Sequence, residues 1–260
     1  MKDFPLITSR KNTEVRAAAA LADSAAERKK QGLFLAEGAR LCEDAAKSGV
    51  TIRKVFVTDA ALQKYAVYLA PVLRQAREVY RVEEHVAELL ADTRHTQGVF
   101  CLCETPAARE TRLAGKWAAL EKIQDPSNLG TIMRTAEALG LAGLLLVGGC
   151  DAFSSKVIRA SMGAAFRLPL LFCADITQAA RLPGMEEMAC FAAVPEASAK
   201  PLGSFPFPEN AVVFIGNEGG GLSEEAVRFC GQAITIPMKG RAESLNAAAA
   251  AAICLWEAAK

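Results

Sequence analysis

The segment VVFIGNEGGGLS, residues 212–223, joins an apolar run to a glycine-rich turn. The apolar residues 212–215 are typical of a strand buried on both faces of a sheet. Gly216, Asn217, Glu218 and three more glycines follow, and Ser223 is a residue type that often begins a helix. The order of strand, turn and helix is the repeating unit of a parallel α/β sheet.

The same order recurs through the C-terminal half of the chain. From Lys116 onward, short apolar runs are followed by polar or glycine turns and helical segments; the runs are 118–123, 144–147, 189–194, 211–215 and 233–236. This alternation predicts a parallel α/β sheet. Because such sheets bind ligands beyond the carboxyl ends of their strands, the segments that follow the strands are the candidate functional sites.

The first of these segments is IQDPSNLGTIMRTAEALG, residues 123–140. Residues Asp125 to Asn128 are of types that are common in turns. A helix is predicted over 129–139, ending at Gly140. Asn128 is expected to cap this helix, which places Arg134 inside it. Taken alone, the segment is equally compatible with a loop, an ordinary cap and a surface arginine.

The second segment is the glycine turn after 212–215. It is no dinucleotide fingerprint, since GxGxxG is absent, and no phosphate loop, since no GK[ST] follows. Glycines permit close approach of the backbone to a ligand, although a merely permissive turn is the alternative. Glu218 within this turn is harder to explain by structure alone.

The third segment is ITIPMKGRAESLNAAAA, residues 234–250, in which a strand and a loop lead into an alanine-rich helix. Ser244 or Asn246 is expected to cap that helix. A simple capped C-terminal helix is the alternative to a functional role.

The composition excludes several classes of protein. The 260 residues are 52% hydrophobic, which permits a large core. The formal net charge is +1, so binding of a nucleic acid would depend on a local basic patch and not on the charge of the whole chain. The eight cysteines contain no CxxC pair and only His85 and His95 accompany them, so we expect no metal and a reducing cytoplasm. We also expect no secretory signal and no membrane span.

The N-terminal part follows a different pattern. An alanine-rich helix is expected over 13–30, a strand and helix over 34–48, and strands at 55–57 and 99–103. The polar stretch TPAARETRLAG, residues 105–115, lacks apolar periodicity. We therefore expect domains at 1–105 and 116–260, joined by a linker at 106–115.

Taken in order, the three segments resemble the motifs of the SpoU (TrmH-like) family of RNA ribose 2′-O-methyltransferases. The matching stretches are Gln124 through Gly140, Gly216 through Leu222 and Ile236 through Asn246, with SSKVIRASMGAAFRLPL (154–170) between them. ITSRKNTEVR, KKQGLFLAEGARLCEDA and TQGV resemble the substrate-binding domain that many members carry, a small ribosomal-protein-like α/β fold that binds RNA.

The resemblance implies a fold that no spacing argument predicts, a parallel-sheet domain with a deep trefoil knot. It further implies S-adenosylmethionine as cofactor and a homodimer with the active site at the subunit interface. The implied catalytic residues are Asn128, Arg134, Glu218, Ser244 and Asn246, and the implied cofactor-binding residues are Ile215, Gly216, Asn217, Ile236, Met238 and Leu245. Because a guanidinium is not expected to lose its proton, a base role for Arg134 competes with one in which it orients a phosphate.

RNA is the expected partner, and large-subunit (23S) ribosomal RNA is preferred over transfer RNA because of the added N-terminal domain. The expected RNA contacts are Arg10, Lys11, Arg16, Arg28, Lys29, Lys30, Arg40, Lys156 and Arg159. Three alternatives stay open: an inactive RNA-binding or ribosome-assembly homologue, a knotted enzyme that methylates a base nitrogen, and an ordinary nucleotide-binding α/β enzyme.

Overall fold

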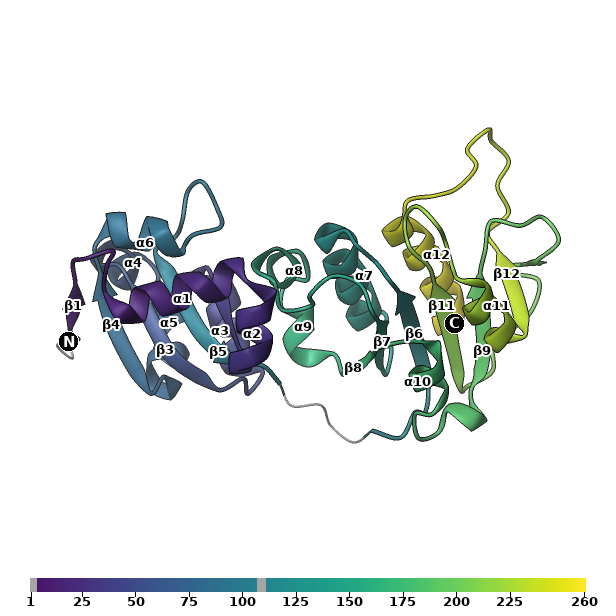
Figure 1. Ribbon diagram of the computed structural model, residues 1–260, viewed down its shortest axis with the longest axis horizontal. Helices are drawn as coiled ribbons and strands as arrows, with labels where there is room; N and C mark the ends of the chain where they lie inside the picture. The colour runs from purple at the N-terminus through teal and green to yellow at the C-terminus, as the bar shows by residue number, and fades with distance from the viewer. Residues whose placement is uncertain (1–3, 107–110) are drawn as a thin grey trace. The chain divides into compact units, whose positions relative to one another are not determined.

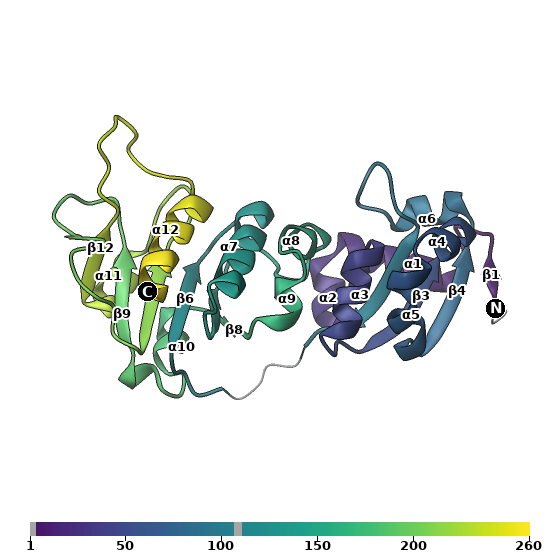
Figure 2. The same cartoon turned by 180° about the vertical axis from the view of Figure 1, so that it is seen from behind.

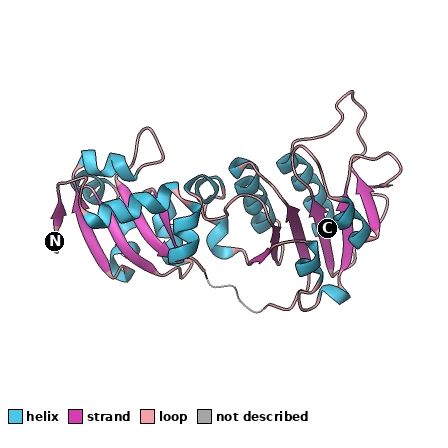
Figure 3. Ribbon diagram, viewed as in Figure 1, coloured by secondary structure: helices cyan, strands magenta, loops and turns pink. Residues whose placement is uncertain are grey.

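The computed structural model describes residues 4–106 and 111–260 (Figure 1). The chain forms two compact units. Unit 1 comprises Met1–Ala107 with Asp151–Phe166, and unit 2 comprises Ala108–Cys150 with Arg167–Lys260. Each unit is built around its own sheet (Figure 3).

Unit 1 contains a mixed five-stranded sheet of order β1-β4-β3-β5-β2, in which β5 is antiparallel to both of its neighbours. Its strands are β1 (Leu6–Ile7), β2 (Leu33–Glu37), β3 (Ile52–Val57), β4 (Glu78–Val82) and β5 (Val99–Glu104). Its helices are α1 (Thr13–Asp23), α2 (Ala25–Gln31), α3 (Ala39–Lys47), α4 (Asp59–Lys64), α5 (Ala66–Gln75), α6 (Glu84–Leu90), α8 (Ser155–Ala160) and α9 (Ala164–Arg167). A core of Val15, Phe56, Val86 and Phe100 joins α1 and α6 to the sheet.

The helix expected over 13–30 is interrupted once. Ser24 takes an extended conformation (φ −119°, ψ 113°) between α1 and α2. Its hydroxyl accepts a hydrogen bond from the backbone N–H of Glu27 at 3.2 Å and so caps α2. The alanine-rich composition predicted helix correctly, but the capping preference of serine divides it into two.

Unit 2 contains a seven-stranded sheet of order β10-β12-β9-β11-β6-β7-β8, and every described pairing in it is parallel, as the alternation predicted. Its strands are β6 (Lys116–Glu121), β7 (Gly143–Val147), β8 (Leu170–Cys173), β9 (Ala189–Ala193), β10 (Lys200–Pro201), β11 (Ala211–Ile215) and β12 (Gln232–Thr235). Its helices are α7 (Pro126–Ala138), α10 (Ile176–Ala180), the 3-10 helix η1 (Met185–Glu187), α11 (Glu224–Cys230) and α12 (Ala247–Ala259).

Helices cover both faces of the unit 2 sheet. Ile176 of α10 and Ala226 of α11 pack with Trp117 and Phe214 on one face. On the other face α12 contacts α7, β11 and β6 (Figure 2). Since both faces are covered, the central strands β7 and β11 are buried along their whole length.

The segment 151–166 lies within the C-terminal half of the sequence but packs in unit 1. Phe34 of β2 stacks near Phe153 and Phe166, with ring centroids 5.3 and 5.8 Å apart. Arg28 forms an ion pair of 2.6 Å with Asp151. The domain boundaries expected at 105 and 116 stay a prediction, and residues 107–110 of the expected linker lie outside the described residues.

Candidate active site

The glycine loop after β11 closes tightly on itself. At Gly216 an added Cβ would lie 2.0 Å from the carbonyl carbon of Gly221 and 2.2 Å from the backbone nitrogen of Leu222. The backbone groups of Asn217 and Gly221 exchange two hydrogen bonds, of 3.0 and 2.9 Å. Only a residue without a side chain fits at position 216, because the obstacle is backbone rather than a movable side chain.

The side chain of Asn217 fixes this loop to the neighbouring strand end. Its Nδ2 donates to the carbonyl oxygen of Lys122 at 2.8 Å, directly after β6. Its Oδ1 accepts from the N–H groups of Gly219 and Gly220 at 2.8 and 3.1 Å. The amide of Asn217 therefore joins the loop that follows β11 to the end of β6.

Glu218 binds the beginning of α7. Its Oε1 accepts from Asn128 Nδ2 at 2.9 Å and from the N–H of Asp125 at 3.1 Å, and its Oε2 accepts from the N–H of Gln124 at 3.1 Å. Partial desolvation raises the pKa of Glu218, but these hydrogen bonds together outweigh it and lower the pKa below the ordinary value. The carboxylate is thus held ionised as an acceptor.

Asn128 connects Glu218 to the beginning of α12. Its Oδ1 accepts from Asn246 Nδ2 at 3.0 Å, while Asn246 Oδ1 accepts from the N–H groups of Ala248 and Ala249 at 2.9 and 3.2 Å. Asn246 is therefore the cap of α12, one of the two candidates that the sequence offered. A continuous series of side-chain hydrogen bonds joins Glu218, Asn128 and Asn246.

Asn128 itself is not a cap, contrary to the sequence-based expectation. The cap of α7 is Asp125, whose side chain accepts from the N–H of Ser127 at 2.7 Å, and Pro126 occupies the first turn. The helix begins three residues earlier than expected because Pro at the first helical position is pre-organised for it. Asn128 thereby lies inside the helix, where its side chain is buried.

Arg134 and Ser244 lie outside this hydrogen-bond series. Both side chains are exposed, and neither has a hydrogen-bond or ion-pair partner within the part of the chain that the structure describes. Glu218 therefore positions Asn128 and the backbone before α7, and Arg134 is not among its partners. Arg134 is free to bind an external group.

A pocket of about 530 Å³ lies in unit 2 beside the glycine loop. All six residues expected to bind the cofactor line it, and so do Glu218 and Ser244; Asn128, Arg134 and Asn246 do not. Its wall is largely apolar, with Leu222, Val227 and Ile234 among the lining residues. The pocket thus combines apolar side chains with the backbone of two loops, which suits a flat ring with polar edges.

The sequence reasoning missed part of this pocket. Val194, Pro195 and Glu196 follow β9 and line the pocket, as does Cys254 of α12. The rule that ligands bind beyond strand ends could have found Pro195 and Glu196, since they directly follow the apolar run 189–194 that was expected to form a strand. Cys254 carries no comparable signal, because it belongs to an alanine-rich helix with no polar pattern.

The expected RNA contacts differ in how available they are. Six are exposed basic side chains, Lys11, Arg16, Lys29, Lys30, Arg40 and Lys156, and Arg10 is about half exposed while paired with Glu88. Arg159 is paired with Asp92 at 2.8 Å. Arg28 departs from the expectation: it is buried, and its guanidinium binds Asp151 and backbone carbonyls, which leaves it no surface for RNA.

Residues 4–106 and 111–260 contain neither a metal-binding cluster nor a membrane-spanning helix. They contain no cluster of three or more His, Cys, Asp or Glu side chains arranged to hold a metal ion. No helix among them combines the length and the apolar character needed to span a bilayer.

Two parts of the chain each match a known protein family. Residues 117–256 match the SpoU rRNA Methylase family, and residues 12–101 match the MRM3-like substrate binding domain. The chain is 30% identical to the 23S rRNA (guanosine(2553)-2′-O)-methyltransferase of Bacillus subtilis, over 88% of this chain and 90% of that protein. It is 32% identical to an uncharacterized tRNA/rRNA methyltransferase of Synechocystis sp., over 98% and 94%.

Solved structures agree with these matches. An S-adenosylmethionine-bound rRNA methyltransferase from Sinorhizobium meliloti superimposes with a TM-score of 0.86 at 29% identity, over 98% of this chain and 97% of that one. The SpoU methyltransferase AviRb from Streptomyces viridochromogenes, in complex with the same cofactor, superimposes with a TM-score of 0.86 at 27% identity, over 96% and 97%.

Proposed function

The chain belongs to the SpoU rRNA methylase family, and from this premise we propose that it methylates a ribose 2′-hydroxyl of large-subunit (23S) ribosomal RNA with S-adenosylmethionine as donor. One observation in this chain carries the proposal. The glycine loop and the loop before α12 line one pocket, and hydrogen bonds join Glu218 to Asn128 and Asn128 to Asn246.

The residues present fit the cofactor. Gly216 allows the loop at the pocket edge to close against the backbone of Gly221 and Leu222, and Ile215, Ile236 and Leu245 supply apolar surface for an adenine ring. Backbone groups of these loops are proposed to hold the adenine and ribose, with Met238 and Asn217 at the pocket wall. When bound, the cofactor supplies an electrophilic methyl group, and the protein's task is to hold the acceptor oxygen in line with it.

Arg134 is proposed to bind the RNA rather than to accept a proton. A guanidinium keeps its positive charge in proteins. An exposed Arg134 without an internal partner is suited to bind a phosphate through two N–H groups, so that a phosphate oxygen can take the hydroxyl proton. Glu218, Asn128 and Asn246 act as positioning residues, and Ser244 is proposed to order the loop over the cofactor.

Unit 1 is proposed to bind the RNA. Its exposed basic residues give a nearly neutral chain a local positive surface, and phosphate contacts of this kind supply affinity without base specificity. We retain the domain limits 1–105 and 116–260, joined by a linker at 106–115, as part of the proposal. Segment 151–166, which includes Lys156 and Arg159, packs within unit 1 and so extends this surface.

We propose that the active protein is a homodimer with a trefoil knot in unit 2. The strand that precedes α12 is β12, which lies next to one edge of the sheet, whereas α12 itself contacts β6 and β11 in the middle of the sheet. A knotted connection requires the chain to come back across the sheet in this way. On α12, Ile253 and Trp256 are 42% and 58% exposed, at a spacing that places them on one helix face. Apolar side chains exposed together favour a protein interface.

The protein is further proposed to act in the cytoplasm. All eight cysteines are free thiols, six of them buried, which is the usual state in a reducing compartment.

Methyl transfer from isotopically labelled S-adenosylmethionine to unmodified ribosomal and transfer RNA tests the proposal. We expect label in large-subunit rRNA, and mass mapping should place it on a ribose 2′-oxygen. Label in transfer RNA alone would contradict the proposed substrate, and label on a base nitrogen would contradict the proposed acceptor. Calorimetric titration with the cofactor tests the inactive-homologue alternative, which predicts no binding.

A further inference from the structure

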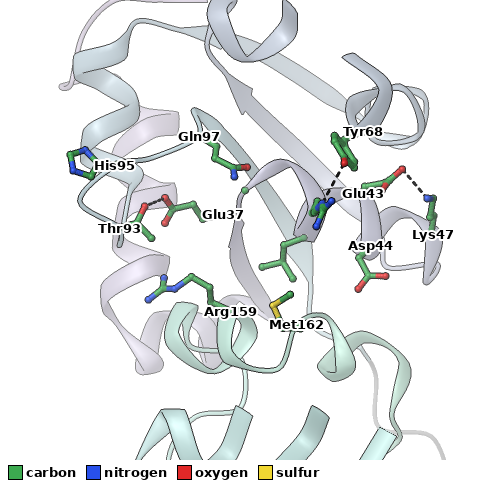
Figure 4. Close-up of a pocket in the computed structure, with 13 residues that line it drawn as sticks. Glu37, Glu43, Asp44, Lys47, Tyr68, Thr93, His95, Gln97, Arg159 and Met162 are labelled. Atoms are coloured by element: carbon green, nitrogen blue, oxygen red, sulfur yellow. Dashed lines mark hydrogen bonds and ion pairs between the residues drawn. The ribbon is translucent and has the colours of Figure 1, made fainter. Parts of the chain in front are cut away.

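A second cavity, of about 520 Å³, lies entirely within unit 1 (Figure 4). It shares no lining residue with the pocket in unit 2. Its walls come from the end of β2, from α3 and α5, from the loop 93–97 and from segment 151–166. Its volume falls in the range of about 300–1,000 Å³ that is typical of small-ligand sites.

The charges around this cavity are balanced. Three carboxylates and three cations line it: Glu37, Glu43, Asp44, Arg40, Lys47 and Arg159. Several are already paired, Glu43 with Lys47 at 2.8 Å and Arg159 with Asp92 at 2.8 Å. A phosphate placed here would meet carboxylates as well as cations, so the cavity suits an uncharged polar group better than an anion.

The cavity also offers surfaces on which a flat ring can pack. The guanidinium carbon of Arg40 lies 5.7 Å from the centroid of the Tyr68 ring, and Arg40 Nε donates to the Tyr68 hydroxyl at 3.3 Å. Met162 is 58% exposed and lines the cavity, and Figure 4 shows Met162 and Tyr68 among the lining side chains. Aromatic rings, guanidinium planes and thioethers are the groups on which unpaired bases stack.

Gln97 supplies hydrogen-bonding groups at the cavity wall. Its Oε1 accepts from the N–H of Ala39 at 2.9 Å, which fixes the orientation of the amide. Its Nε2 then has no protein partner among the described residues and can donate to a ligand. The cavity thus provides stacking surfaces together with a donor held in place, the combination that distinguishes a base from a phosphate.

We propose that this cavity binds the base of one unpaired nucleotide of the RNA substrate, a nucleotide other than the one that is methylated. The proposal rests on the proposed function, because it requires an RNA substrate. It adds a contact with a base to the phosphate contacts proposed above for the surface of unit 1. None of the residues proposed for methyl transfer lines this cavity, so the nucleotide bound here serves recognition.

Four variants of the full-length protein test this proposal. Met162→Gly removes the thioether at a residue with φ of +50°, where glycine is favoured, so folding should be preserved. Arg40→Ala removes the guanidinium plane, and Arg40→Lys keeps its charge without the plane. Arg74→Ala is the matched control, an exposed arginine on α5 that does not line the cavity.

Steady-state methylation of the RNA identified for the wild type gives the first result. We expect Met162→Gly, Arg40→Ala and Arg40→Lys each to raise KM for RNA by about tenfold, with kcat at saturating RNA and cofactor Kd within about twofold of wild type. Arg74→Ala should resemble the wild type. If Arg40→Lys also resembles the wild type, the contact is one of charge and the base proposal is wrong.

Chemical probing of the bound RNA gives the second result. One unpaired nucleotide that the wild type and Arg74→Ala protect should become reactive with Arg40→Ala and Met162→Gly, and it should differ from the methylated one. An unchanged protection pattern, or wild-type KM values for all variants, would refute the cavity proposal while leaving the proposed function intact. A wild-type protein that methylates no RNA would instead refute the proposed function.

Discussion

Glu218 Oε1 accepts a hydrogen bond from Asn128 Nδ2 at 2.9 Å, although the two residues lie 90 positions apart in the sequence. Asn128 in turn accepts from Asn246, 118 positions further along. Three segments that follow three different strands are therefore joined through their side chains. Such a series can set the relative positions of the loops that line the pocket, and each of its members can be tested separately.

Gly216→Ala should destabilise unit 2 and prevent cofactor binding. The new methyl group would lie within about 2.3 Å of the backbone of Gly221 and Leu222, and overpacking of this kind costs about 1–3 kcal/mol. Urea unfolding measures the stability, and calorimetric titration measures cofactor affinity. Gly220→Ala is the control for stability, because nothing lies within 4 Å of its added Cβ. Equal stability of the two variants would show that the loop relaxes freely.

Asn246→Asp and Asn246→Ala should separate the two roles of Asn246. Aspartate retains the acceptor that caps α12 but loses the N–H donor to Asn128. Alanine loses both, so it should lower the free energy of unfolding by about 1 kcal/mol more than aspartate does. Both variants should lose activity if the hydrogen bond to Asn128 positions the loops. Wild-type turnover by Asn246→Asp would show that capping alone matters.

Arg134→Lys should lower kcat by at least about tenfold without affecting stability. The Arg134 side chain is exposed and has no partner among the described residues, so its replacement should change the free energy of unfolding by less than about 0.5 kcal/mol. Activity should fall because an ammonium cannot form the planar, two-point contact with a phosphate that a guanidinium forms. Methylation rates at saturating RNA provide the measurement. Nearly full activity of Arg134→Lys would exclude any role that needs the planar group.

The sequence was most informative where polar residues follow buried strands. The alternating pattern predicted the parallel sheet, and the residues after β6, β11 and β12 contain Asn128, Glu218 and Asn246, which the structure brings together. Their partners could not be predicted, because a side-chain contact across 90 residues depends on the order of strands in the sheet. The edge strand β8 was not predicted either, since its four residues follow a proline and carry no alternating pattern.

Two further differences between expectation and structure have local causes. Asn128 and Asp125 are both good capping residues, and Pro126 decided in favour of Asp125. Arg28 belongs to the basic run 28–30, which resembles a surface patch, yet its position on α2 directs it into the interior. Its partner, Asp151, is 123 residues away, so the run alone does not distinguish a structural arginine from its exposed neighbours.

Acidification should weaken the wild type more than Glu218→Gln. Hydrogen bonds hold the pKa of Glu218 below its ordinary value despite partial desolvation, so the native state binds its proton less readily than the unfolded chain, in which a glutamate titrates at about 4.3. The stabilisation is complete above that unfolded value and is lost as the pH falls through the lower native pKa. Urea unfolding between about pH 6 and pH 3 gives the two stability curves, and subtracting them cancels the carboxylates that both proteins share. The difference should shrink toward low pH; parallel curves would show that the hydrogen bonds from Asn128 and the backbone do not favour the ionised carboxylate.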